Sequence, residues 1–152
     1  MNLKPLRDLI LGERWAALAT LADAQPLASQ VAYAVLPDFS GIVLHLSELA
    51  AHTRALMTHP YASLSVSEAD DGRQDPQTLV RVSLSGAVRL LEPESEAYRD
   101  ARQCYLARLP ASEPLFEFAD FRLFVLEPEK IRFVGGFGAA RSFDGSALRE
   151  VP

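Results

Sequence analysis

The chain has 152 residues, which suits one domain with a substantial core and leaves little length for a second. Its net charge of −5 argues against a general nucleic-acid surface, because such binding depends on clustered Lys and Arg that neutralise phosphates. No apolar run approaches the roughly 18 residues of a membrane span, and a single cysteine, Cys104, excludes an internal disulfide. Arg7 and Asp8 interrupt the N-terminal apolar stretch, so we expect no signal peptide and a cytoplasmic protein.

The first third of the chain predicts a helix, three strands and a second helix. Leucines and an isoleucine at helical spacing predict a helix over residues 3–12, which Gly12 ends. Compact apolar runs between turn residues predict strands over residues 15–21, 27–35 and 42–46. Residues 47–59 carry an apolar stripe at helical spacing, with Ser47 as the N-cap and Pro60 as the stop.

The remainder predicts more strands and one further helix. Residues 61–67 alternate as a strand does, and a polar loop follows over residues 70–76. Around Gly86, apolar side chains recur at even positions from 80 to 90 and polar ones at odd positions, which is the clearest strand pattern in the chain. Apolar spacing then predicts a helix over residues 94–108, two late strands over 121–126 and 131–134, and a glycine-rich turn at 135–138.

The order of these elements predicts the fold class. Strands outnumber helices and do not alternate regularly with them, which argues against a doubly wound parallel sheet. Short turns between the early strands favour antiparallel pairing. We therefore expect a mainly β protein, with roughly six to seven strands closed into a barrel and helices at its periphery. No repeat or interdomain linker occurs, so residues 1–152 predict a single domain.

Two segments are candidates for binding a ligand. At the junction of the third strand and the second helix, Ser47, His52 and Thr53 offer two hydroxyls and an imidazole near a helix N-terminus, which attracts anions. The alternative is an ordinary capped helix. Arg81 lies on the polar side of the clearest strand, where a cation could meet an anionic ligand. The alternative there is a solvated strand face.

Other site types find little support. His45, His52 and His59 recur at seven-residue intervals. Two of them on one helix would lie about 10 Å apart along its axis, too far to share a metal ion, so we expect no metal site. The sequence has no nucleophile elbow, phosphate loop or dinucleotide fingerprint, and we assign no catalytic residue. Cys104 lies in a helical apolar stripe and is expected to be buried and inert.

Five segments in order resemble the pyridoxamine 5′-phosphate oxidase-like FMN-binding split barrels. Residues 26–33, 45–53 and 81–86 are similar to that superfamily, while 120–124 and 132–138 look like its haem-utilisation branch. The resemblance covers about residues 12–143 and leaves 144–152 as a tail. It implies a homodimer with FMN at the interface and a small-molecule substrate. The cofactor-binding residues that it implies are Ser29, Gln30 and Val31 beside the flavin ring, Ser47, His52 and Thr53 at the phosphate, and Arg81 near the flavin.

The resemblance also defines the alternatives. Ala51 and His52 stand where vitamin B6 oxidases place an Arg-Lys pair, which argues against vitamin B6 oxidation. Haem-utilisation proteins bind haem through a C-terminal histidine, and this chain has no histidine after His59. We therefore predict an FMN-dependent oxidoreductase. Haem binding and degradation, a deazaflavin in place of FMN, and a non-enzymatic cofactor-binding dimer stay open as alternatives.

Overall fold

A computed structural model describes residues 2–136 and 139–150, so Phe137 and Gly138 of the predicted glycine-rich turn lie outside the described residues. The protein is mainly β with peripheral helices, as predicted. No helix in the described ranges has the length and hydropathy needed to cross a membrane. In chain order the elements are α1 (Lys4–Gly12), β1 (Trp15–Ala22), β2 (Gln25–Ala32), β3 (Ala34–Val35), β4 (Ile42–Ser47), α2 (Ala51–Thr58), β5 (Tyr61–Ser67), η1 (Pro76–Thr78), β6 (Arg81–Leu90), α3 (Glu96–Arg108), η2 (Pro110–Glu117), β7 (Phe121–Val134), β8 (Ala140–Asp144) and η3 (Gly145–Glu150).

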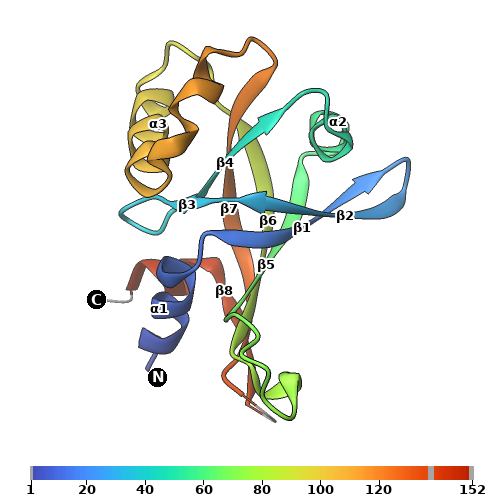
Figure 1. Cartoon of the computed structure of the whole chain (residues 1–152), viewed down its shortest axis with the longest axis vertical. Helices are drawn as coiled ribbons and strands as arrows, with labels where there is room; N and C mark the ends of the chain where they lie inside the picture. The colour runs from blue at the N-terminus through green and yellow to red at the C-terminus, as the bar shows by residue number, and fades with distance from the viewer. Residues whose placement is uncertain (1, 137–138, 151–152) are drawn as a thin grey trace.

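The strands form one curled antiparallel sheet, a half-barrel. Its order is β2-β1-β5-β6-β7-β4-β3, and β8 pairs with the far part of β7, which makes eight strands among the described residues. In Figure 1, the long strands β6 and β7 run the length of the molecule. Helix α3 and η2 lie at the upper left of the view, α2 lies at the upper right, and α1 lies near the C-terminal turn at the lower left.

The inward face of the sheet is a continuous apolar row. Register places Leu18 opposite Leu64, Leu64 opposite Leu84, and Leu84 opposite Ile131. All four side chains are buried. Because strand side chains alternate between faces, the residues between them form an outward row, and this confirms the two-residue pattern predicted for β6.

A second apolar core lies between the sheet and α3. It contains Val43 and Leu123 from the neighbouring strands β4 and β7, and Ala101 and Tyr105 from the helix. The barrel core and this second core therefore share strands β4 and β7, which pass between them.

Strand β7 departs from the prediction of two separate strands. It continues from Phe121 to Val134 through Pro128, and the register of its pairing with β6 shifts between Ser85 and Gly86. A β-bulge of this kind accommodates a proline in a ladder. Gly86 is required there, because a Cβ atom at that position would overlap the carbonyl oxygen of Glu127.

Candidate functional site

The outward face of the sheet carries short side chains on β1, β5 and β6. Register places Ala17, Ser65, Ser83 and Arg132 side by side across β1, β5, β6 and β7. The next row repeats the pattern with Ala19, Ser63, Ser85 and Lys130. Ser85 donates a hydrogen bond to the hydroxyl of Ser63 at 2.9 Å. Such a face allows a flat molecule or a second sheet to approach the backbone closely, with cations at one side.

A pocket of about 540 Å³ lies on the cationic side of this face. It combines two arginines with hydroxyl and amide side chains. Its lining consists of Ser65, Gln77, Arg81, Val82, Ser83, Arg132, Val134 and Ala140. The pocket therefore offers positive charge and hydrogen-bond donors to an anionic ligand.

The two guanidinium groups are held in place on neighbouring strands. Nη1 of Arg81 donates to the carbonyl oxygens of Gln77, at 2.8 Å, and Leu79, at 3.0 Å. Nη1 of Arg132 donates to the hydroxyl of Ser142 at 3.1 Å. Arg81 pairs with Val134, so Arg132 is its diagonal neighbour on the same face, and such neighbours lie about 7–8 Å apart. The strand register thus places two cations side by side, where they could meet two carboxylates of one ligand.

Of the three residues predicted beside a flavin ring, Gln30 alone shares the outward face with Arg81. It pairs with Ala17 and extends that row. Ser29 lies opposite the buried Leu18 and donates to its carbonyl oxygen at 3.4 Å. Val31 is buried in the barrel core. The alternation of side chains along β2 separates Gln30 from Ser29 and Val31, which share the inward face.

The predicted N-cap at Ser47 is wrong. Helix α2 begins at Ala51 with Ala50 as its N-cap, and Ser47 is the last residue of β4. The hydroxyl of Ser47 is occupied, because it donates to a carboxylate oxygen of Asp120 at 2.6 Å and accepts from the backbone N–H of Leu49 at 3.1 Å. This bond ties the end of β4 to the start of β7.

His52 and Thr53 occupy the first turn of α2. His52 is half-buried, and burial lowers its pKa below the ordinary histidine value. Thr53 is fully buried, and its hydroxyl has no hydrogen-bond partner among the described residues. Thr53 lines a small pocket of about 320 Å³ together with Glu48. Neither residue lines the pocket that contains Arg81, so the structure does not bring the predicted phosphate-binding residues and Arg81 together.

His45 lies in an aromatic cluster that the sequence analysis did not identify. Its ring is buried and contacts the rings of Phe116, Tyr105 and Phe121. Burial, with a smaller contribution from Arg102, lowers the pKa of His45 to about 4. Within residues 2–136 and 139–150, no group of three His, Cys, Asp or Glu could hold a metal ion. Because its pKa is lowered to about 4, the imidazole of His45 is a neutral packing group at physiological pH.

Comparisons with known proteins relate the chain to one family and to three individual proteins. A family model described as CREG, beta-barrel, matches residues 4–147. The chain is 32% identical over 149 residues to the chloroplastic non-canonical haem oxygenase HOZ of Arabidopsis thaliana, which covers 95% of this chain and 44% of that protein. It therefore spans less than half the length of this curated relative.

Two solved structures are similar to the protein. A haem-binding protein from Mycobacterium smegmatis superposes with a TM-score of 0.85 at 32% identity, over 95% of this chain and 58% of that one. A protein of the pyridoxine-phosphate oxidase family from Clostridium acetobutylicum superposes with a TM-score of 0.72 at 12% identity, over 96% of both chains. The second likeness is one of fold alone.

Proposed function

The chain belongs to the CREG β-barrel family, and we propose that it binds haem in the pocket that contains Arg81 and Arg132. The predicted resemblance to oxidase-like split barrels, nearest the haem-utilisation branch, is confirmed by the family match and by the relatives described above. Haem is the alternative that the family resemblance predicts. It is better supported than FMN, because both relatives at 32% identity are haem proteins by name.

The observation that carries the proposal is the pair of fixed arginines beside a flat face. Haem is a flat macrocycle with two carboxylates, and arginine is the side chain best suited to carboxylate recognition. Ser65 and Ser83 project from the same face, between the cations and the alanines of β1. Arg81 and Arg132 would bind the carboxylates, and the short side chains would support the ring.

The donor set fits the carboxylates of haem better than its iron. Haem iron in proteins is held by His, Cys, Met or Tyr, and the residues lining this pocket include none of these types. The histidines lie elsewhere: His45 in the aromatic cluster, His52 on α2 and His59 just before β5. Bound haem would supply redox chemistry of its own. The chain's residues would bind the macrocycle, orient it and neutralise its charge.

FMN is the second candidate, and one observation favours it. The hydroxyl of Thr53, which has no partner among the described residues, belongs to a pocket at the first turn of α2. A phosphate there would accept hydrogen bonds from backbone N–H groups. Glu48 lines the same pocket but is paired with Arg122, whose Nε lies 2.6 Å from its carboxylate, and Arg54 lines the pocket as well. We place FMN second because both relatives at 32% identity are haem proteins by name.

We further propose that two copies of the chain pack through the outward face. Ala19 and Ala28 are exposed there as cross-strand neighbours, and Trp15 on the same face is 59% exposed. An Ala19→Arg substitution would place a charge in the centre of this interface. We expect it to produce a monomer in sedimentation velocity, while the control Leu49→Arg, at an exposed position on the turn after β4, leaves the dimer intact. Equal masses for both variants and the parent would contradict the interface.

Titration of the purified protein with haemin tests the main proposal. Binding is expected to produce a saturable Soret difference spectrum at one haem per chain. A spectrum identical to that of free haemin at every protein concentration would overturn it. Loss of the Soret band on adding a reductant in air would extend the proposal from binding to degradation. A single-domain organisation and a cytoplasmic location stay predictions.

A further inference from the structure

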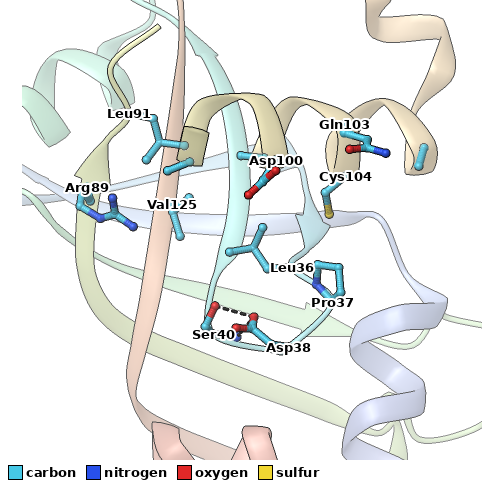
Figure 2. Close-up of a pocket in the computed structure, with 13 residues that line it drawn as sticks. Leu36, Pro37, Asp38, Ser40, Arg89, Leu91, Asp100, Gln103, Cys104 and Val125 are labelled. Atoms are coloured by element: carbon cyan, nitrogen blue, oxygen red, sulfur yellow. Dashed lines mark hydrogen bonds between the residues drawn. The ribbon is translucent and has the colours of Figure 1, made fainter. Parts of the chain in front are cut away.

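A second cavity lies between α3 and the turn that joins β3 to β4 (Figure 2). Its volume is about 590 Å³, within the range of about 300–1,000 Å³ usual for small-molecule sites. The helix faces it with short side chains at helical spacing, which are those of Ala97, Ala101, Cys104 and Ala107. Leu36, Leu91 and Val125 add apolar surface. The cavity thus has room for an apolar group such as one aromatic ring.

Carboxylates lie at the mouth of this cavity. Figure 2 shows Asp100 projecting from α3 toward the turn that carries Asp38 and Ser40. The backbone N–H and the hydroxyl of Ser40 donate to one oxygen of Asp38, at 3.0 and 2.6 Å. These bonds, with a weak contribution from Arg149, hold the pKa of Asp38 below its ordinary value. The carboxylate is therefore ionised and fixed in place.

The positive charge that lines the cavity is already paired. Nε of Arg89 lies 2.9 Å from a carboxylate oxygen of Glu127. Neither Asp38 nor Asp100 forms a salt bridge with a Lys, Arg or His among residues 2–136 and 139–150. The mouth of the cavity thus carries net negative charge above an apolar floor.

Phe39 fixes the conformation of this turn. Phe39 has a φ of +60°, a conformation that residues other than glycine rarely adopt. Its ring is buried, and the guanidinium carbon of Arg7 lies 5.0 Å from the ring centroid. With Phe39 anchored in the core, Asp38 and Ser40 on either side of it line the cavity.

We propose that this cavity binds a small amphipathic amine. The apolar body occupies the space between Leu36, Ala101 and Val125, and the protonated nitrogen lies between Asp38 and Asp100. A neighbouring cavity of about 340 Å³ shares Pro37, Cys104 and Ala107 with it, which gives room for a longer chain on the amine. The site is independent of the proposed haem pocket, because the two share no lining residue.

Three probes of similar size separate charge from shape: 2-phenylethylamine, 2-phenylethanol and 3-phenylpropanoate. Calorimetric titration at pH 7 is expected to give the amine an affinity about tenfold higher than the alcohol, with the acid weakest, as opposite charges at the mouth require. The amine should also slow alkylation of Cys104 by iodoacetamide, since the thiol borders the cavity. Binding of the acid as tightly as the amine, or binding of none of the three, would overturn the proposal.

Variants assign the binding to this cavity. Asp100→Asn and Asp38→Asn should each weaken the amine about two- to fivefold and leave the alcohol unchanged. Ala101→Leu should fill the cavity and abolish binding of amine and alcohol, with circular dichroism confirming the fold. The control Asp8→Asn removes an exposed carboxylate on α1, which pairs with Lys4, and should change nothing. Equal amine affinity in Asp100→Asn, Asp38→Asn and the control would refute the assignment.

Discussion

The imidazole of His45 stacks on the phenyl ring of Phe116, with centroids 3.8 Å apart and planes within 9°. The guanidinium carbon of Arg102 lies over the same phenyl ring, 5.0 Å from its centroid. The stack joins β4 to η2, and it forms with a neutral imidazole because burial lowers the pKa of His45 to about 4. Protonation would place a second cation against a ring that already contacts one.

Acid should therefore destabilise the protein through His45. The unfolded chain binds a proton near pH 6.5, whereas the folded chain does so only near pH 4, so the free energy of unfolding falls as pH drops between these values. The loss amounts to about 3 kcal/mol at most. Urea unfolding at pH 7 and pH 4.5 measures it. His45→Phe should reduce this dependence, leaving the smaller contribution of His52, and the control His59→Phe, at an exposed position, should retain it.

Removing either arginine of the proposed haem pocket should weaken haem binding. Arg81→Gln and Arg132→Gln each delete a cation that would meet a carboxylate, and we expect about tenfold weaker binding for each. Arg89→Gln, on the same strand but in the other cavity, serves as the matched control. Haem dimethyl ester lacks the carboxylates and should bind the parent and both variants alike. A similar loss with the ester would show that the arginines act on the fold instead.

Thr53→Val tests the FMN alternative. Valine keeps the shape of threonine and removes a buried hydroxyl that has no partner among the described residues, so the free energy of unfolding should rise by about 1 kcal/mol. If FMN binds at this turn, the variant and a His52→Ala variant should weaken FMN and leave riboflavin unchanged, because only FMN carries the phosphate. Equal losses for both flavins would show that Thr53 and His52 are structural.

Gly86→Ala should destabilise the sheet severely. The added methyl group would overlap the backbone of Glu127 at the β-bulge, so β6 and β7 would have to separate locally. We expect a loss of about 3 kcal/mol or more in the free energy of unfolding. Gly12→Ala is the matched control: no atom lies within 4 Å of its added Cβ, and it should be neutral or slightly stabilising. Comparable losses in the two variants would contradict this account of Gly86.

The sequence predicts the parts of the fold that depend on local pattern. The even positions of β6 from Val82 to Val88 are buried as expected, and the three α-helices lie within a few residues of the predicted ranges. Strand β8 was missed because four of its five residues are exposed, which leaves no alternation to detect. The sequence does not predict the continuity of β7, because a proline such as Pro128 usually ends a strand. The β-bulge at the opposing Gly86, which accommodates this proline, is evident only from the pairing of the two strands.

The candidate sites depend on pairing that no local pattern contains. Arg81 was identified from alternation within its own strand, but its neighbour Arg132 was not, because only the register between β6 and β7 places them together. Ser47 reads as a helix cap because its partner, Asp120, is 73 residues away in the chain. The cavity beside α3 likewise requires a turn and a helix that lie far apart in sequence.

That same separation of 73 residues has a consequence for synthesis on the ribosome. Strand β4 pairs along its full length with β7, while its other neighbour, β3, covers two residues. At translation rates of about 5–20 residues per second, roughly 4–15 s separate the synthesis of β4 from that of β7. During this time the long edge of β4 has no partner strand. An apolar strand with an unpaired edge is prone to associate with other chains. Nascent chains that stop before Phe121 should therefore recruit chaperones, and chains that extend past Val134 should release them.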